Sequence, residues 1–342
     1  MSRRIRRIAL LSAPVALLAA VALSARTPGA QSGAAAWRTF DVTYQFTVRD
    51  IPPGAESIKA WIPLPLSDKW QRLEGYRVEG PWPHEIIDEE EYGNRFLLLD
   101  LSESAGKAGA EAAVTARFRI NRRAYRTLEE GGGGEKEPQA ALGRFLAPDR
   151  LVPINGKIAE EAKRIAGRVD DPLRQARLIY DHIVDSMVYA KSGVGWGRGD
   201  ASYACDVRTG NCTDFHSLFI GEARSLGLPS RFIMGLPVPQ DSSEGPIAGY
   251  HCWAEFYIDS KGWIPIDASE AHKDRARLDD LFGGLDANRV AFTIGRDIAI
   301  PGASGSLLNY VIYPHVEIEG EPYGKLETSF YFREVDSEES ET

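Results

Sequence analysis

One stretch of the chain decides the fold: residues 210–216 read Gly-Asn-Cys-Thr-Asp-Phe-His. Apolar residues then recur at helical spacing, and the pattern ends at Gly227 with Pro229 following. We therefore expect a helix that begins near Cys212. A thiol at a helix N-terminus lies close to unpaired N–H groups, whose partial positive charge favours the thiolate. The stretch predicts a nucleophilic cysteine, against the alternative of a small apolar core residue.

A second segment supplies an imidazole. Residues 249–257 read Gly-Tyr-His-Cys-Trp-Ala-Glu-Phe-Tyr and alternate with the period of a β-strand. Cys252 falls on the fully apolar face, which we expect to point into the core. His251 and Trp253 fall on the other face, where His251 can meet Cys212. An imidazole beside a thiol takes and returns its proton, so the segment predicts a base for acyl transfer.

A third segment supplies a carboxylate. Residues 262–267 read Gly-Trp-Ile-Pro-Ile-Asp and predict the next antiparallel strand. The intervening turn, if centred, pairs Asp267 nearer Ala254 than His251, so a diagonal or bulged contact is needed. With that contact, Asp267 would hold the tautomer of the imidazole. An exposed turn acid is the alternative.

Together the three segments resemble the transglutaminase-like, papain-related cysteine acyltransferases, over residues 145–275. The Gly-rich run 195–200 together with 210–216 is similar to exported bacterial members. The resemblance implies a papain-like core in which Cys212 is the nucleophile, His251 the base and acid, and Asp267 the orienting carboxylate. The resemblance further implies that the protein is an enzyme that cleaves or transfers an amide acyl group through a thioester on the cysteine.

The resemblance also implies a second oxyanion donor, an aromatic side chain upstream of the cysteine. Trp196 and Tyr203 are both candidates beside the backbone N–H of Cys212, and core packing is an equal alternative for each. We name Trp253, on the face of His251, as a supporting residue. Glu255 on that face would brace the site or pair with Arg231.

The fold class predicted is α+β: helices packed on an antiparallel sheet, preceded by an N-terminal β-sandwich with no chemistry of its own. Helices are expected over 155–168, from Pro172 onward and from 212 to 227, and strands over 230–236, 252–258 and 263–267. The predicted divisions are a signal peptide (1–25), a linker (26–36), a β-sandwich-like domain (37–127), a linker (128–139), a transglutaminase-like catalytic domain with a β-rich C-terminal part (140–335) and an acidic tail (336–342).

Composition limits the partners. The chain has 342 residues and a net charge of −9, which argues against nucleic acid and against an electrostatic hold on anionic lipid. Residues 3–7 hold four arginines, residues 8–23 are mostly apolar, and small residues follow. This layout predicts a secretory signal and a product in the periplasm or outside the cell. An uncleaved membrane anchor is the alternative, and the substrate expected is a peptide or protein.

Two rival functions use the same residues. A metal site would draw on Cys205, Cys212 and Cys252 with nearby histidines, but the close Cys or His pairs typical of zinc sites are missing, so we expect no metal and no cofactor. A non-catalytic scaffold or binding module of the envelope is the second rival. The odd number of cysteines leaves at least one free thiol, and a disulfide between Cys205 and Cys252 is compatible with the count.

Overall fold

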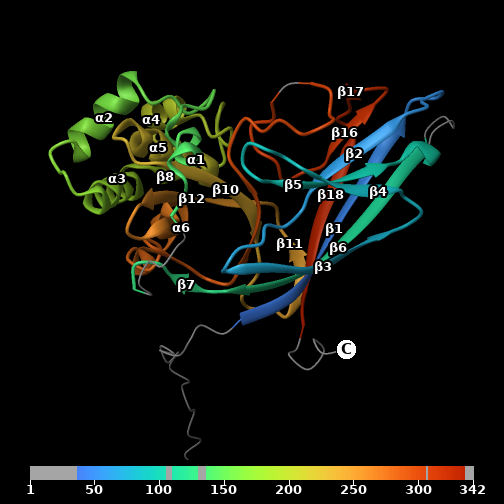
Figure 1. The fold of residues 1–342 in the computed structure, drawn as a ribbon, viewed down its shortest axis with the longest axis horizontal. Helices are drawn as coiled ribbons and strands as arrows, with labels where there is room; N and C mark the ends of the chain where they lie inside the picture. The colour runs from blue at the N-terminus through green and yellow to red at the C-terminus, as the bar shows by residue number, and fades with distance from the viewer. Residues whose placement is uncertain (1–36, 105–109, 130–135, 306, 336–342) are drawn as a thin grey trace, which may run out of the picture. The chain divides into compact units, whose positions relative to one another are not determined.

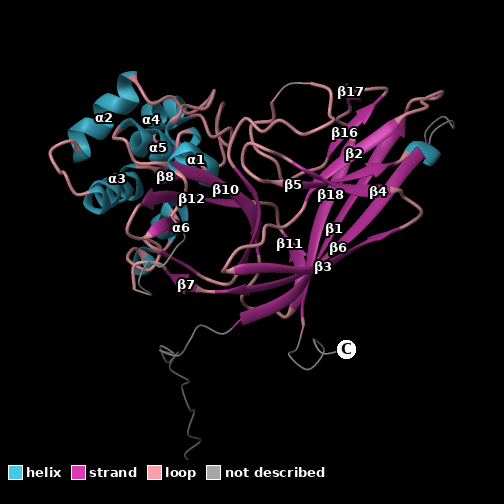
Figure 2. Ribbon diagram, in the orientation of Figure 1, coloured by secondary structure: helices cyan, strands magenta, loops and turns pink. Residues whose placement is uncertain are grey.

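The computed structural model describes residues 37–104, 110–129, 136–305 and 307–335. The predicted signal peptide, first linker and acidic tail lie outside the described residues, as do residues 130–135 of the second linker. None of the described helices is long and apolar enough to cross a membrane. Figure 2 shows the helices gathered at one side and the long strands at the other.

The first five-stranded sheet contains the longest strands. Its spatial order is β11 (Glu244–Ile247), β18 (Leu326–Glu334), β1 (Trp37–Ile51), β6 (Ala110–Arg123) and β3 (Gln71–Glu79), all antiparallel. In β1 every second residue from Phe40 to Val48 is buried, as the alternating sequence predicts. Figure 1 shows β18, in red, beside β1, in blue.

The second five-stranded sheet covers that buried face. Its order is β17 (Glu321–Pro322), β16 (His315–Ile318), β2 (Ile58–Pro63), β5 (Arg95–Asp100) and β4 (His84–Asp88). Ile58 and Leu99 belong to the same apolar core as Phe40, whereas Trp61 and Phe96 pack in a second cluster with Ile298. The sheet is therefore buried on both faces over its central strands.

The third large sheet, antiparallel and four-stranded, carries the predicted site. Its order is β13 (Gly262–Ile266), β12 (His251–Ile258), β10 (Ser230–Pro237) and β15 (Arg289–Ile294). The helices are α1 (Gln139–Leu142), α2 (Gly156–Ala166), α3 (Pro172–Ser186), α4 (Ala201–Val207), α5 (Cys212–Ser225) and α6 (Ala268–Lys273). Helix α5 packs on β12 and β10. The short elements are β7 (Tyr125–Arg126), β8 (Val188–Tyr189), β9 (Thr209–Gly210), β14 (Gly284–Leu285) and three 3-10 turns (Ser102–Ser104, Arg144–Leu146, Arg275–Arg277).

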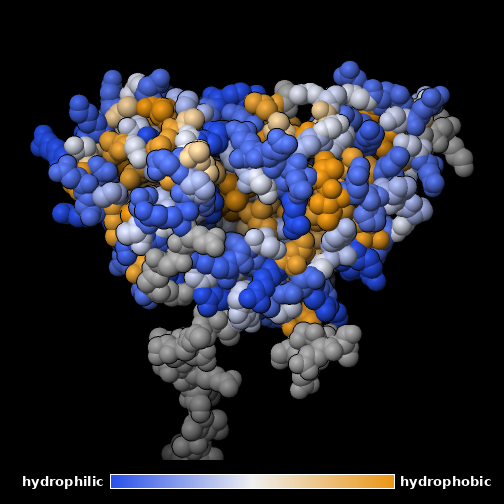
Figure 3. Space-filling view, in the orientation of Figure 1, coloured by the Kyte–Doolittle hydropathy of each residue, from blue (hydrophilic) through white to orange (hydrophobic). Residues whose placement is uncertain are grey.

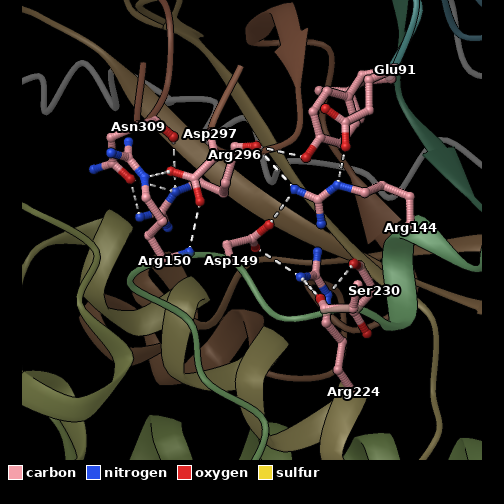
Figure 4. Close-up of polar contacts among 12 residues, drawn as sticks. Glu91, Arg144, Asp149, Arg150, Arg224, Ser230, Arg296, Asp297 and Asn309 are labelled. Atoms are coloured by element: carbon pink, nitrogen blue, oxygen red, sulfur yellow. Dashed lines mark hydrogen bonds and ion pairs between the residues drawn. The ribbon is translucent and has the colours of Figure 1, made fainter. Parts of the chain in front are cut away.

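A chain of buried ion pairs joins α5 to the strand-rich part. Figure 4 shows Asp149 between two arginines: Arg144 donates to one carboxylate oxygen at 2.7 Å and Arg224, of α5, to the other at 2.8 Å. Arg144 also pairs with Glu91, in the turn between β4 and β5. The network ties the C-terminal half of α5 to the second sheet. Removing Asp149 would leave the buried guanidinium of Arg224 without its ion-pair partner, whereas Arg144 is partly exposed and keeps Glu91.

The fold class is confirmed: helices pack on an antiparallel sheet, and the N-terminal region is rich in strands. The sandwich differs from the prediction in one respect, because its two sheets take β11, β16, β17 and β18 from residues 244–334 as well as strands from 37–127. The described residues between 37 and 335 belong to one compact unit. Pairing between the two ends of the chain is non-local, so the spacing within either end does not reveal it.

Figure 3 shows polar side chains over most of the visible face, with apolar residues exposed between them in separate patches. The largest apolar residues are mostly inside, and Trp61, Trp253 and Tyr44 are among the largest that are fully buried. An exception is Val194, in the Gly-rich loop before α4, which is 96% exposed.

Candidate active site

Helix α5 begins at Cys212, as predicted, with Asn211 as its N-cap. The Asn211 side-chain oxygen accepts from the N–H of Thr213 at 2.9 Å, and the carboxylate of Asp214 accepts from the N–H of Asn211 at 3.0 Å. This reciprocal arrangement satisfies donors that the first helical turn cannot pair internally. Cys212 is thus held at the positive end of the helix dipole with only 2% of its surface exposed.

Asp214 also binds the Gly-rich loop to the start of the helix. Its carboxylate accepts from the N–H groups of Gly197 at 2.7 Å and Gly199 at 3.0 Å. Gly210 makes this approach possible, because a Cβ there would lie 2.3 Å from the Asp214 Oδ2. Sequence reasoning overlooked Asp214, although a capping side chain three residues after Asn211 was a usable signal.

His251 and Asp267 are in contact. The imidazole Nε2 lies 2.7 Å from Oδ2 of Asp267. In the strand register Ala254 pairs with Ile266, so Asp267 lies just past the end of β13 and reaches His251 diagonally. The diagonal contact that the sequence required is present, and it leaves Nδ1 of the ring for the thiol.

Asp267 is fully buried and has further donors. Its Oδ2 accepts from Arg289 at 3.0 Å, and its Oδ1 accepts from Ser269 at 3.1 Å and from the N–H of Glu270 at 3.0 Å. Burial alone would raise the pKa of Asp267, but His251 and Arg289 hold it well below the usual range. The carboxylate therefore stays ionised and keeps the imidazole oriented.

The thiol of Cys212 has two hydrogen-bonding neighbours. The pKa of Cys212 is held well below that of a free thiol, first by a hydrogen bond from Cys252 and then by His251. Burial disfavours the imidazolium, yet Asp267 and Cys212 raise the pKa of His251 to about 10. These opposite shifts favour a thiolate–imidazolium pair.

Cys252 makes a contact that the sequence did not indicate. The alternation of β12 assigned it to a core face, opposite the face of His251, and it is indeed fully buried. Its thiol nevertheless reaches Cys212, and the pKa of Cys252 is raised well above the usual value by burial and by Cys212. Every residue of β12 except Ile258 is buried, so both faces of the strand have neighbours. Cys252 remains a protonated donor to the nucleophile.

His216, one turn after Cys212 in α5, acts as a neutral neighbour. Its Nε2 accepts from the N–H of Ala268 at 3.1 Å, and its Nδ1 lies 3.6 Å from the Cys252 sulfur. Burial lowers the pKa of His216 to about 4. His216 therefore links α5, β12 and α6 without adding charge beneath the thiolate.

The three supporting residues have different positions. Trp253 is buried, and the guanidinium of Arg289 lies 5.2 Å from its ring centre, so it packs against the group that binds Asp267. Tyr203, in α4, lies under Gly195, where an added Cβ would be 3.0 Å from its ring. Trp196 is half-buried in the same loop. The choice between Trp196 and Tyr203 as oxyanion donor stays a prediction.

The thiols and imidazoles considered for a metal site have other partners: Cys212 and Cys252 contact each other, and Cys212 contacts His251. Among the described residues no group of three or more His, Cys, Asp or Glu side chains is placed to hold a metal ion. All three cysteines are free, and Cys205 donates to Glu161 at 3.1 Å instead of forming a disulfide. Glu255 accepts from Arg231 at 2.7 Å, which is one of the two roles that the sequence left open.

Two buried arginines at the site were missed by sequence reasoning. Arg289, on β15, forms ion pairs with both Asp267 and Asp286. Arg296 follows β15 and donates to Ser217 of α5 at 2.6 Å and to the carbonyl of Gly199 at 3.0 Å. Apart from Asp286, which is three residues from Arg289, these partners are more than 20 residues away in the sequence, so the local pattern gives no sign of them.

A cavity of about 260 Å³ opens beside His251. Its walls come from the end of β10, the loop before β12, helix α6 and the segment that leads into β15. Tyr189 and Tyr250 give it aromatic sides, and the hydroxyl of Tyr250 accepts from Asn211 at 3.0 Å. A substrate in this cavity would lie next to the imidazole.

Comparisons with known proteins agree with this geometry. Residues 160–268 match the family model described as the transglutaminase-like superfamily. An uncharacterised protein of Haemophilus influenzae is 26% identical over 320 residues, which are 83% of this chain and 86% of that protein. An uncharacterised protein of Mycobacterium leprae is 30% identical over 145 residues, 39% of this chain and 48% of that one.

A solved structure has the same fold. It is a candidate cysteine protease from Cytophaga hutchinsonii, with a TM-score of 0.59 and 17% sequence identity, and the match covers 88% of this chain and 92% of that one. At this identity the likeness extends to the fold and not to the reaction.

Proposed function

We propose that this chain, which belongs to the transglutaminase-like superfamily through residues 160–268, is an exported cysteine enzyme that cleaves or transfers an amide acyl group. The observation that carries the proposal is the order of contacts: thiol, imidazole, carboxylate, at the start of a helix. The hydrogen bond of 2.7 Å between His251 and Asp267, with Cys212 next to the imidazole, gives each group the neighbour that its role requires.

The proposed reaction has two halves. The Cys212 thiolate attacks the carbonyl carbon of the amide, and the N–H groups near the start of α5 stabilise the oxyanion. The C–N bond then breaks, and the imidazolium of His251 gives its proton to the leaving amine, which leaves a thioester on Cys212. Water or a second amine attacks this thioester while His251 takes its proton, and the thiolate is regenerated.

The choice between the two outcomes depends on water. Water gives hydrolysis, and a bound amine gives transfer. The cavity beside His251 is open enough to admit either, so we propose the broader activity: peptidase, amidase or crosslinking enzyme on an envelope peptide or protein. Export rests on the arginines and apolar run of residues 3–23.

Trapping of the thioester tests the proposal. Purified protein is mixed with a panel of peptide amides, quenched in acid and digested, and Cys212 is examined for an acyl adduct by mass spectrometry. We expect an adduct that hydroxylamine releases as a hydroxamate and that is lost in His251→Ala. A protein whose Cys212 neither reacts with these amides nor is alkylated faster than an ordinary thiol would favour a non-catalytic scaffold instead.

Export is tested separately. A C-terminally tagged chain is expressed in a bacterium, and the cells are fractionated. We expect the tag in the periplasmic or secreted fraction. Retention in the cytoplasm would contradict export without affecting the chemistry.

A further inference from the structure

The charges around the cavity beside His251 do not balance. Four cationic side chains line it, and two anionic ones, Glu270 and Asp286. The cations are Lys191, Lys273, Arg277 and Arg289. This local excess is positive in a chain whose net charge is −9. A cluster of opposite sign to the rest of a protein indicates the charge of the group that it binds.

Most of these cations already have partners. Arg277 donates to Asp286 at 2.7 Å, and Arg289 is held by Asp286 and Asp267. Lys273 donates to Glu270 at 2.6 Å. Lys191 is exposed and follows β8 in the loop before α4, and the described ion pairs do not include it. One cation of the cavity is therefore available for an external anion.

The ammonium of Lys273 is a second possible hydrogen-bond donor to an anion in the cavity. Its ammonium lies 3.8 Å from the ring centre of Tyr189, two residues before Lys191. The ring and Glu270 fix the position of this ammonium, which has three N–H groups and can serve an anion as well as Glu270. Because Glu270 competes for Lys273, an anion would meet Lys191 first.

The position of the cavity shows which side of a substrate it receives. His251 lines the cavity, and Cys212 is not among its lining residues. In the proposed reaction His251 gives its proton to the leaving amine and removes one from the attacking amine. The group bound here is thus attached to the amine, and a volume of about 260 Å³ suits a fragment of about one amino acid.

We propose that this cavity binds a carboxylate carried on the amine side of the amide substrate, with Lys191 as its main cation and Lys273 beside it. The inference rests on the proposed function and names its substrate class: peptides or amino acids whose leaving or accepting amine carries a carboxylate. Tyr189 and Val238 provide an apolar wall for the carbons between the amine and the carboxylate.

Two matched alkylating reagents test it in the full chain. Iodoacetylglycine carries a carboxylate and iodoacetylglycinamide carries a neutral amide of the same size. In each case the Cys212 sulfur bonds to the methylene carbon as iodide leaves. The rates at Cys212 are followed by peptide mass spectrometry, and their ratio is divided by the same ratio for 2-mercaptoethanol.

The variants separate Lys191 from the imidazolium, which also attracts anions. We expect Lys191→Gln to lower the normalised ratio by about fivefold, the size of one exposed charge pair, and Lys191→Glu to lower it further. Glu270→Gln should raise the ratio, because Lys273 is then released. Lys163→Gln, at an exposed position of α2 away from the cavity, should leave it unchanged. A ratio that Lys191→Gln does not alter overturns the proposal.

A second readout does not depend on the thiol. Lys191 is acetylated with N-hydroxysuccinimidyl acetate in the presence of acetylglycine or acetylglycinamide. Slower acetylation with acetylglycine supports the carboxylate site, and equal rates overturn it. If neither iodoacetyl reagent labels Cys212, the proposed function fails while this measurement still decides the site.

Discussion

Two clusters in this chain contain the same four kinds of group in a different order. Around Cys212, the imidazole of His251 stands between the thiol and the carboxylate of Asp267, which Arg289 also binds. Around Cys205, the thiol donates directly to the carboxylate of Glu161 at 3.1 Å. The same carboxylate binds His182 and Arg208 as well.

The different order gives the two thiols opposite character. Burial and the Glu161 carboxylate raise the pKa of Cys205 to about 12, whereas the pKa of Cys212 is held well below the usual value. A carboxylate next to a thiol repels the thiolate, but a carboxylate one imidazole away stabilises the imidazolium that the thiolate needs. The kinds of group in a cluster therefore do not identify a nucleophile. What identifies it is which group lies directly next to the thiol.

The largest expected difference between the two clusters is in how much each carboxylate contributes to the free energy of unfolding. Asp267→Ala leaves the buried His251 without its carboxylate and Arg289 with Asp286 alone, and we expect a loss of about 3–5 kcal/mol in the free energy of unfolding. Glu161→Ala should cost about 1–2 kcal/mol, because the side chains of His182 and Arg208 are 27% and 26% exposed and reach water. Urea titrations measure both. A larger loss for Glu161→Ala would reverse the comparison.

Glu161→Gln should make Cys205 more reactive. The amide keeps the size of the side chain but removes the charge that opposes the thiolate, so we expect alkylation at pH 9 to rise by roughly tenfold. The rate at Cys212 in the same sample is the control and should not change. An unaltered Cys205 would mean that burial alone holds its pKa high.

Cys252→Ala should weaken the nucleophile. The variant removes the S–H donor to the Cys212 thiolate, and we expect alkylation of Cys212 at pH 6 to slow by on the order of tenfold. Cys205→Ala serves as the matched control and should have no effect on this rate. Equal rates in the wild-type protein and Cys252→Ala would show that His251 alone maintains the thiolate.

A further prediction concerns how the free energy of unfolding changes with pH. Between pH 6.5 and about 9, Cys212 and His251 together bind one proton in the folded protein, which the imidazolium of His251 carries. In the unfolded protein the same two residues also bind one proton, which the Cys212 thiol carries. The pair therefore contributes no slope in this window. In Cys212→Ala, the pKa of His251 is still raised by Asp267, so the stability that it contributes is present below pH 6.5 and is lost as pH rises through that raised pKa.

Denaturant titrations across pH 6.5–9 measure this slope. The stability difference between the wild-type protein and Cys212→Ala should grow with pH, by up to about 1.4 kcal/mol per unit. A difference that is constant with pH would contradict the ion pair. Cys205→Ala should show no such trend below about pH 8, because Cys205 is protonated there in both the folded and the unfolded protein.

Local signals predicted the elements that hold the candidate site. The residues before Cys212 and the apolar spacing after it predicted a helix that begins near Cys212, where α5 begins, and the alternation of β12 predicted the strand that carries His251. Helix α2 spans Gly156–Ala166 where residues 155–168 were expected. Each of these features depends on residues that are close in the sequence, and the spacing of apolar residues along the chain indicates contacts only over that short range.

Long-range contacts could not be predicted. Arg289 and Asp267 are on strands at opposite edges of the four-stranded sheet, and no spacing rule joins them. Cys252 lies in the core, as alternation predicted, but its contact with Cys212 was missed, because alternation assigns a face of the strand and not the partners on that face. Likewise β18 pairs with β1 across almost the whole chain.

The most direct test is the pH dependence of alkylation by iodoacetamide, followed at Cys212 and Cys205 in one sample by peptide mass spectrometry. We predict that Cys212 reacts rapidly at pH 6, where a free thiol of pKa about 8.5 is almost fully protonated, and that Cys205 does not. His251→Ala should slow Cys212 at pH 6 by roughly a hundredfold. Equal rates at the two cysteines, or a Cys212 rate that His251→Ala leaves unchanged, would contradict the account.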